Sequence, residues 1–460
     1  MYKLHDAAKA LGLTLSYDDR DVGPACIDTR KLKKGDLFFA MPGEHVDGHL
    51  FVAKAAQLGA CAAVVRTDVA LSADVPKDFP LLNVNDVLVA LQQLARWWRD
   101  AHDAPVIGVT GSNGKTSTKE LIAIALGVRG KVHRTEGNLN NHIGMPVSLL
   151  AWPQEAWAAV LEMGMSAPGE IATLARLARP TIGVITNIAP AHLGPMGSVE
   201  AIARAKGEIF ESLPADGIGF VNLDDPYVCS IAEPLLGERK RITFGRDPMS
   251  DICIVATEIE ALQTRIDLNV MGTPVHVDLP LLGLHFAYNT AIALGIAHVL
   301  GVDVAHSAHA LSTGSVPGGR MRVLHISDGE VTLVDDTYNA NPSSMVAALT
   351  TIGAIHVEGE RIAVLGDMLE MGPESAKYHH DVGREAARAG FTMIYGVGER
   401  AGDIVEGAKQ GGADGLVCSS TDDAIAKLLV TMHFGDWILC KGSRGMRMER
   451  VVQGLLEAAP

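Results

Sequence analysis

The chain has 460 residues, of which 48% are hydrophobic and 20% charged, and its formal net charge is −15. At about 150 residues per domain, this length predicts roughly three domains. The negative charge is spread along the chain and no Lys/Arg-rich patch is interleaved with aromatic residues, which argues against nucleic-acid binding. The apolar runs are too short to span a bilayer and the first residues lack a signal-peptide core, so we expect a cytoplasmic protein.

The six cysteines are scattered and form no C-x-x-C pair. This spacing indicates reduced, mostly buried thiols rather than a metal site or a disulfide framework.

The first 82 residues have the pattern of a small α/β domain. A loop dense in Gly, Asp and His, which includes Gly43, Asp47 and His49, follows the tripeptide Asp28-Thr29-Arg30. Composition alone favours solvated turns here, whereas next to a nucleotide site the same loop could clamp a substrate. The expected elements are helices over 4–11 and 49–58 and strands over 36–41 and 62–65.

The stretch Val106–Lys119, VIGVTGSNGKTSTK, has the features of a phosphate-binding loop. An apolar strand-like run meets a glycine-rich turn, and a helical pattern begins at Lys115 and Thr116. Glycines let backbone N–H groups turn toward one oxyanion, the helix presents its positive end, and the Thr116 hydroxyl can bind Mg²⁺. The residue five before Gly114 is Val109 rather than glycine, so the loop is a variant of the general form.

Strand and helix patterns alternate along the remaining chain, which predicts parallel sheets covered by helices, with ligands at the carboxyl ends of the strands. Residues 251–280 look like a small antiparallel insert, and a Gly/Pro break at 316–319 marks a boundary. We therefore predict an α/β protein of three domains: a small N-terminal α/β domain (1–82), a central P-loop-type parallel-sheet domain (83–315) and a C-terminal Rossmann-like α/β domain (316–460).

Three residues of the central domain are candidates for chemistry. Glu162 follows four apolar residues at a strand end, where it should face a metal, a cation or water, with a surface carboxylate as the alternative. A lone loop histidine such as His192 is usually a surface residue, but its place beside Glu162 and Thr116 favours a role in the site. Taken alone, Lys206 is a helix-surface lysine.

A further group of polar residues lies in the third domain. Asp335 and Asp336 close a strand, where paired carboxylates can accept ribose hydroxyls or hold an ammonium group, or can simply cap the turn that follows. Arg320 and the run Lys441-Gly442-Ser443-Arg444 are basic groups at similar edges that could meet phosphate or carboxylate ligands.

Together these residues resemble the Mur ligases, the ATP-dependent amide-forming ligases of peptidoglycan synthesis. Residues 110–116 are similar to the TG-x-NGKT form of that family, which accounts for the missing glycine. The segments TEGNLNNHIG (135–144), DDTYNANPSS (335–344) and LGDMLEMG (365–372) resemble the branch that joins D-alanyl-D-alanine to UDP-N-acetylmuramoyl-tripeptide. The chain departs from that pattern at Thr29, where serine is more usual, and at Met371, where leucine is common.

The resemblance implies a reaction with ATP and Mg²⁺ that proceeds through an acyl phosphate, in a monomer that acts on small-molecule substrates. It also implies that Lys206 is carbamylated, because a carboxylate there can help hold a second Mg²⁺ whereas an ammonium would repel it. The implied catalytic residues are Lys115, Glu162, His192 and Lys206, and the implied metal ligands are Thr116, Glu162, His192 and carbamylated Lys206.

The resemblance also assigns three sets of binding residues. Those for ATP are Gly111, Ser112, Asn113, Gly114, Lys115, Thr116, Ser117, Asn289, Arg320 and Asp336. Those for the UDP substrate are Thr29, Arg30, Gly43, Asp47, His49, Thr135, Asn138 and Asn141. Those for the dipeptide are Asn339, Asn341, Lys441, Ser443 and Arg444.

Three alternatives remain at this point. A sibling amide ligase, such as folylpolyglutamate synthase or a diaminopimelate- or lysine-adding Mur ligase, shares the nucleotide chemistry and differs in the amine it uses. An ATP-driven switch would release phosphate without forming an amide. A non-catalytic scaffold would not need the set Lys115, Thr116, Glu162 and His192.

Overall fold

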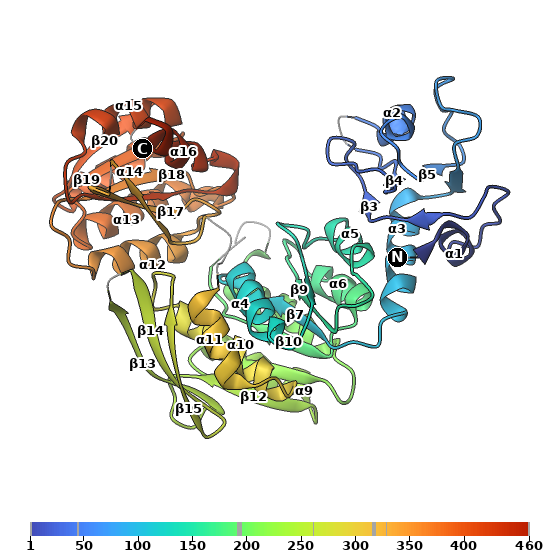
Figure 1. Ribbon diagram of the computed structural model, residues 1–460. Helices are drawn as coiled ribbons and strands as arrows, with labels where there is room; N and C mark the ends of the chain where they lie inside the picture. Colours follow the sequence, from blue (N-terminus) through green and yellow to red (C-terminus); the bar gives the residue numbers. More distant parts are fainter. Residues whose placement is uncertain are drawn as a thin grey trace.

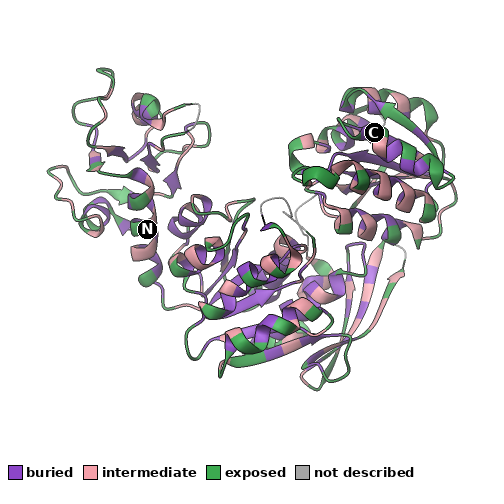
Figure 2. Ribbon diagram, turned by 180° about the vertical axis from the view of Figure 1, so that it is seen from behind, coloured by how far each residue is buried: buried purple, intermediate pink, exposed green. Residues whose placement is uncertain are grey.

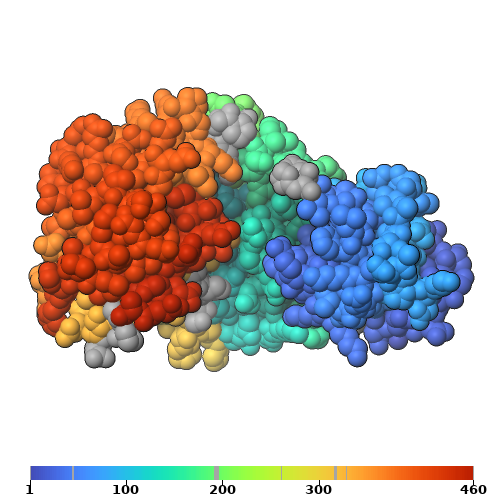
Figure 3. All heavy atoms as spheres, turned by 90° about the horizontal axis from the view of Figure 1, so that it is seen from above, coloured from blue at the N-terminus to red at the C-terminus, as the bar shows by residue number. Residues whose placement is uncertain are grey.

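The computed structural model describes residues 2–43, 46–190, 196–260, 262–314, 319–327 and 329–458. The N-terminal and C-terminal parts stand on either side of a central part, which forms the floor between them (Figures 1 and 3). The sheets are buried and the helices cover them with their exposed faces outward (Figure 2). The predicted α/β class with three domains is confirmed.

A parallel four-stranded sheet forms the N-terminal part, in the order β3-β4-β5-β6. All four residues of β6 pair with β5, so the predicted domain end at residue 82 falls inside a strand and is too early. A strand pattern in the sequence does not reveal which sheet the strand joins. The elements are β1 (Tyr2–Lys3), α1 (Leu4–Ala10), β2 (Asp21–Val22), β3 (Ala25–Cys26), β4 (Leu37–Phe39), η1 (Gly48–Phe51), α2 (Val52–Gln57), β5 (Ala62–Arg66) and β6 (Leu81–Val84).

Helix α3 (Val87–Asp100) joins the N-terminal part to the central part. It contacts α1 on one side and α5 (Gly144–Leu150) and α6 (Glu170–Ala178) on the other. The Arg99 guanidinium donates hydrogen bonds to the carbonyl oxygens of Ala178 (2.7 Å) and His102 (2.6 Å). Polar bonds and a shared apolar cluster therefore hold the first sheet against the second.

The central sheet has nine strands in the order β15-β14-β13-β12-β11-β10-β7-β9-β8. The predicted antiparallel insert is part of this sheet, because β13 pairs in parallel with β12 and begins an antiparallel extension. The strands are β7 (Val106–Thr110), β8 (Val132–Arg134), β9 (Ala158–Glu162), β10 (Ile182–Ile185), β11 (Ile218–Asn222), β12 (Lys240–Gly245), β13 (Ile252–Glu260), β14 (Gln263–Val270) and β15 (Thr273–Leu279).

Helices cover both faces of the central sheet. One face carries α4 (Lys115–Gly127), α10 (Phe286–Val299) and α11 (Val304–Thr313), and the other carries α5, α6, α8 (Val199–Glu211) and α9 (Pro226–Leu236). Residues of β7 explain the two layers: Ile107 and Val109 belong to one apolar cluster and Val106 to the other. This alternation is the period-two pattern of a strand buried on both sides.

The C-terminal sheet has the order β16-β17-β21-β18-β19-β20, and all neighbours are parallel except β16 and β17. The predicted alternation of parallel strands and helices is present, and β16 adds an antiparallel edge strand to it. The elements are β16 (Arg322–Ile326), β17 (Val331–Asp336), α12 (Pro342–Gly353), β18 (Arg361–Gly366), η2 (Gly372–Glu374), α13 (Ser375–Arg388), β19 (Met393–Val397), α14 (Ala401–Gln410), β20 (Asp414–Cys418), α15 (Thr421–Thr431), β21 (Trp437–Lys441), η3 (Arg444–Met446) and α16 (Glu449–Ala458).

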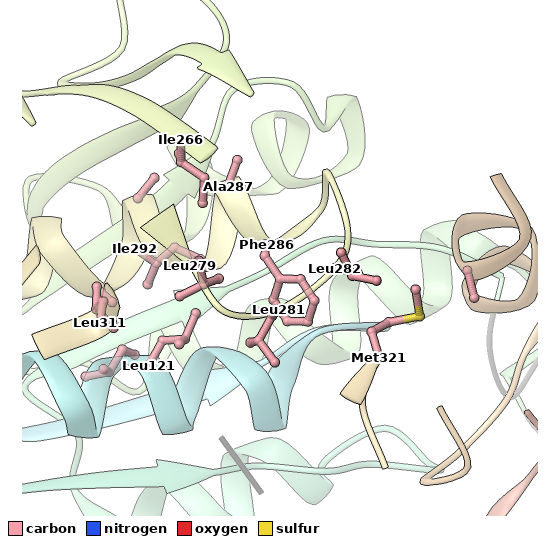
Figure 4. Packing of buried hydrophobic residues seen from close by; sticks show 14 of the residues in the cluster. Leu121, Ile266, Leu279, Leu281, Leu282, Phe286, Ala287, Ile292, Leu311 and Met321 are labelled. Carbon is pink, nitrogen blue, oxygen red and sulfur yellow. The ribbon is translucent and has the colours of Figure 1, made fainter. Parts of the chain in front are cut away.

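One apolar cluster continues from the central part into the C-terminal part. Phe286 and Leu281 pack beside helix α4, and Met321 lies at the end of the same row of side chains (Figure 4). The predicted boundary at 315/316 lies outside the described residues. Among the helices of the described ranges, none combines the length and the apolar character needed to cross a bilayer.

Candidate functional site

The phosphate loop connects β7 to α4. Gly114, with φ of 78°, immediately precedes the helix, so the backbone turns in a conformation that favours glycine. The Lys115 ammonium lies over the loop and donates to the carbonyl oxygens of Gly111 (2.7 Å) and Ser112 (3.3 Å). Burial lowers the pKa of Lys115. The loop thus places a cation and a helix N-terminus at one point, which is an anion site.

The missing glycine has a structural reason. Val109 is fully buried within β7, and it pairs in register with Glu162 on β9. The chain turns only at Gly111, whose Cα faces Thr186: a Cβ there would lie 1.8 Å from the Thr186 hydroxyl oxygen. Residue 109 is therefore a strand residue in this chain, and the close approach that requires glycine falls at Gly111.

The segment after β10 supports the loop from the side. The Asn113 N–H donates to Asn187 Oδ1 (3.0 Å), and the Thr186 hydroxyl donates to the Asn113 carbonyl oxygen (2.6 Å). The Ser112 hydroxyl donates to the Ala189 carbonyl oxygen (2.9 Å). His192, predicted as a catalytic residue and metal ligand on this segment, lies outside the described residues.

Glu162 ends β9 with a side chain that is only 2% exposed. Its Oε1 accepts a hydrogen bond from Asn140 Nδ2 (2.8 Å), and its backbone N–H donates to the Thr135 hydroxyl (3.0 Å). Its Oε2 is buried and has no hydrogen-bond partner among the described residues. Asn140 was missed from the sequence, although it stands between the predicted Asn138 and Asn141 in the same motif.

These groups fit a divalent cation. A buried carboxylate oxygen without a partner is costly, and Mg²⁺ prefers oxygen ligands. Thr116 lies in the first turn of α4, and Glu162 pairs in register with Val109 of β7, the strand that leads into that helix. Within the described ranges, no three His, Cys, Asp or Glu side chains converge on one position, so a cation here would also need ligands from the substrates or from other residue types.

Lys206 is buried on α8, at 2% exposure, so the surface-lysine alternative is wrong. In the part of the chain that the structure describes, its ammonium has no hydrogen-bond or ion-pair partner. Burial, together with the charge of Lys115, lowers the pKa of Lys206 well below that of an ordinary lysine. The neighbouring Glu208 is turned away and accepts from the backbone of Gly169 and Ala172. The amine therefore spends more time neutral, which is the form that reacts with CO₂.

The C-terminal part touches the phosphate loop directly. Asn113 Nδ2 donates to the Ser343 hydroxyl (2.8 Å), and Asn341 Nδ2 donates to Asn113 Oδ1 (2.6 Å). The Asn341 side chain also caps α12. Asn341, predicted to bind the dipeptide, is thus bonded to the nucleotide loop in this conformation.

Tyr338 stands at the same junction. The Arg320 guanidinium lies 3.8 Å from the Tyr338 ring centroid, in a cation–π contact. Burial and the charge of Glu162 raise the pKa of Tyr338, against opposing effects of Arg320 and Thr116. Tyr338 belongs to the loop that meets the phosphate loop through Asn341. No sequence pattern singled out Tyr338, because only the folded chain brings the two loops together.

The predicted nucleotide residues of the other elements are buried. Asn289 accepts from the Thr118 hydroxyl (3.0 Å), and its Nδ2 has no partner among the described residues. Asp336 forms an ion pair with Lys441 (2.6 Å), and burial raises the Asp336 pKa against the opposing effect of Lys441. Ser117 is buried on α4. Asn289 therefore offers an unused amide donor, whereas Asp336 is already paired.

The predicted dipeptide residues divide into two kinds. Lys441 also donates to the Asn339 carbonyl oxygen (3.0 Å), and the Ser443 side chain bonds to the backbone of Ala340 and Leu369. Both side chains are buried and already hydrogen-bonded within the protein. Asn339 and Arg444 are exposed. Only these last two present free surface to a ligand.

The predicted UDP-substrate residues also divide. Arg30 pairs with Asp28 (2.7 Å) and holds the pKa of that carboxyl at about 2, yet its side chain is 84% exposed. His49 is buried between Asp47 Oδ1 (2.6 Å) and the Arg66 N–H (2.9 Å), so it shapes the loop. Gly43 is exposed, Asp47 is half-buried and Thr29 is mostly buried.

Three further predicted residues lie on the 135–144 segment. Thr135 is fully buried, which does not fit the predicted contact with the UDP substrate. Asn138 and Asn141 are exposed, and Asn141 also accepts from the Gly144 N–H (2.8 Å) at the start of α5. Thr135 was selected because it begins the motif, and a motif does not show which of its members face inward.

The fold and the site together define an α/β enzyme with a phosphate loop at the junction of two sheets. The Mur ligase middle domain matches residues 109–297, the glutamate ligase domain of Mur ligases matches 319–444, and the Mur ligase catalytic domain matches 25–99. The chain belongs to the Mur ligase family.

Three known proteins illustrate this relationship. The UDP-N-acetylmuramoyl-tripeptide–D-alanyl-D-alanine ligase of Bacillus subtilis is 35% identical over 449 residues, which cover 96% of this chain and 95% of that protein. A crystal structure of MurF from Acinetobacter baumannii is 29% identical, with a TM-score of 0.86 over 99% of this chain and 98% of that one. MurF ligase from Thermotoga maritima in complex with ADP is 27% identical, with a TM-score of 0.81 over 95% and 97% of the two chains.

The contact between Gly111 and Thr186 gives a test of the loop. In a Gly111→Ala variant the new methyl group collides with the Thr186 hydroxyl, an overpacking that costs about 1–3 kcal/mol. We expect ADP binding, measured by titration with a fluorescent ADP analogue, to weaken roughly tenfold. The control is Gly127→Ala at the end of the same helix, where a Cβ meets nothing within 4 Å. Equal binding by both variants would contradict the placement of the nucleotide at this loop.

Proposed function

We propose that this protein is an ATP-dependent ligase of peptidoglycan precursor synthesis that joins D-alanyl-D-alanine to UDP-N-acetylmuramoyl-tripeptide. The observation that carries the chemistry is the phosphate loop with Lys115 and Thr116, together with Glu162 on the neighbouring strand, whose buried Oε2 has no hydrogen-bond partner among the described residues. The choice of substrates is supported by the B. subtilis relative, whose name states this reaction and which aligns with nearly the whole chain.

The proposed reaction has two steps. An oxygen of the tripeptide's terminal carboxylate attacks the γ-phosphorus of ATP, the bond to ADP breaks, and an acyl phosphate forms. The amino group of D-alanyl-D-alanine then attacks the acyl carbon, loses a proton, and the tetrahedral intermediate expels phosphate to leave the amide. ADP and phosphate are the by-products.

The chain's own groups have defined parts in the first step. Lys115, which lies over the loop carbonyls, moves to the β- and γ-phosphates and offsets the charge of the transferring group. Backbone N–H groups at the start of α4 bind the phosphate oxygens. Thr116 and Glu162 are the described residues that would hold Mg²⁺, with His192 and carbamylated Lys206 as the further predicted ligands. Bound there, Mg²⁺ would supply charge neutralisation at the phosphates.

The outer domains position the two substrates. We assign the UDP end to the N-terminal part, with the exposed Arg30, Gly43, Asn138 and Asn141 and the half-buried Asp47 as its contacts. The buried Thr29, His49 and Thr135 support those contacts from behind.

The C-terminal part supplies Arg320 and Tyr338 to the phosphate side and Asn339 and Arg444 to the dipeptide. Its contact with Asn113 covers the loop, which excludes the water that would hydrolyse an acyl phosphate.

We further infer that the protein acts in the cytoplasm as a monomer. All the residues assigned above come from one chain, so the proposed chemistry needs no second copy.

The direct test supplies ATP, Mg²⁺ and UDP-N-acetylmuramoyl-tripeptide with either D-alanyl-D-alanine or single amino acids, and detects the product by mass. We expect one new amide product, formed only with the dipeptide, and a Lys115→Ala variant that folds normally but releases ADP about 10²- to 10³-fold more slowly. A product with diaminopimelate, lysine or glutamate would indicate a sibling ligase. ADP release without either acceptor and without an amide would indicate an ATP-driven switch.

The burial of Lys206 yields a separate prediction about its modification. Because the amine is buried and its pKa is lowered, we expect the intact protein to carry one added CO₂ unit, lost on acidification. Lys206→Ala should lose most activity and regain part of it with added acetate or formate, which replace the missing carboxylate. Lys115→Ala serves as the matched control, because its lost cation cannot be replaced by a carboxylate. An unmodified mass together with full activity of Lys206→Ala would refute the carbamate.

A further inference from the structure

A second buried lysine follows Lys115 by one helical turn on α4. Lys119 is 1% exposed. Its ammonium pairs with Glu120 (2.8 Å) and donates to the Thr135 carbonyl oxygen (2.5 Å). The Glu120 carboxylate also pairs with Arg134 (2.8 Å), at the end of β8. A buried ammonium is expensive unless its hydrogen bonds are satisfied, so this group has a fixed geometry.

Thr135 links that ammonium to Glu162. Its carbonyl oxygen accepts from Lys119, while its hydroxyl accepts from the Glu162 N–H (3.0 Å). Its own N–H donates to the Val160 carbonyl oxygen (3.1 Å), which fixes it beside β9. Five residues later, Asn140 holds Glu162 Oε1 (2.8 Å). The segment 135–140 therefore holds both the backbone and the carboxylate of Glu162, and Lys119 anchors its first residue.

The two described oxygen donors of the cation site lie on different elements. Thr116 is in the first turn of α4, and Glu162 is the last residue of β9. The bond from Lys119 to Thr135 spans these elements, because Lys119 shares the helix of Thr116 and Thr135 contacts Glu162. A loss of this bond would let the distance between the two oxygen donors vary.

We propose that Lys119 is a positioning residue for the cation site: through Thr135 it fixes Glu162 relative to Thr116. This role rests on the proposed Mg²⁺ site. Lys119 does not touch the substrates or the cation. It belongs to the residues that hold metal ligands in place without binding the metal. Removing such a residue typically weakens metal binding by about 10- to 100-fold.

The test measures how ADP binding and turnover depend on Mg²⁺ concentration. The variant is Lys119→Met combined with Glu120→Gln, which keeps the side-chain volumes and avoids a new unpaired charge in the core. We expect the Mg²⁺ concentration for half-maximal effect to rise about tenfold in both measurements. ADP binding without Mg²⁺ and the unfolding temperature should stay near their wild-type values, which a general loss of structure would change.

Two variants of Thr135 separate its contacts. Thr135→Val removes the hydroxyl that accepts from Glu162 and should reproduce the shift in Mg²⁺ dependence, whereas Thr135→Ser keeps it and should not. The surface control is Lys131→Met, which breaks the exposed pair with Glu155 (2.6 Å) and should leave every measurement unchanged.

The outcomes distinguish the positioning role from the cation site itself. A folded Lys119→Met/Glu120→Gln variant with wild-type Mg²⁺ dependence overturns the proposal. If that variant does not fold, Thr135→Val takes its place in the test. Wild-type Mg²⁺ dependence of Thr135→Val would then overturn the proposal. If even the wild-type protein shows no response to Mg²⁺, the cation site fails and the positioning role fails with it, while amide formation remains a separate observation.

Discussion

The site depends on how one residue, Asn113, is held from two sides. Its backbone bonds to Thr186 and Asn187 on the central sheet, and its side chain bonds to Asn341 and Ser343 of the C-terminal part. The phosphate loop is therefore fixed to its own domain and to the domain that covers it. Any movement that opens the nucleotide site must break the second set of bonds, so the approach of the C-terminal domain and the geometry of the loop are physically coupled.

The site also contains buried polar groups without partners among the described residues. Glu162 Oε2 and Asn289 Nδ2 are buried without hydrogen bonds within the described ranges, and Lys206 is a buried amine. Each such group costs free energy in the isolated protein, on the order of 1–3 kcal/mol for a neutral group. Phosphates, a cation and the nucleotide base could satisfy them. The fold thus holds these polar groups in position, and bound ligands would supply their hydrogen-bond and charge partners.

Much of this was predictable from the sequence, and the failures have physical causes. The phosphate loop and most strands could be identified because glycine turns and apolar runs are local signals. Glu162 and Lys206 were identified because they occur in the same order as in the family's motifs. The direction in which a side chain points, in contrast, cannot be read from its sequence neighbours. Thr135 and Lys441, predicted as ligand contacts, are buried and bonded to partners from other segments, Glu162 and Asp336. Tyr338 was missed for the same reason.

The central claim is that this chain activates a carboxylate with ATP rather than hydrolysing ATP to move a partner. The most direct measurement uses UDP-N-acetylmuramoyl-tripeptide whose terminal carboxylate carries a heavy-oxygen label, with ATP, Mg²⁺ and D-alanyl-D-alanine, followed by mass analysis of the released phosphate. If the carboxylate attacks the γ-phosphorus, one labelled oxygen passes to each phosphate as the amide forms. Phosphate that carries no label, or takes its new oxygen from solvent water, would contradict this account.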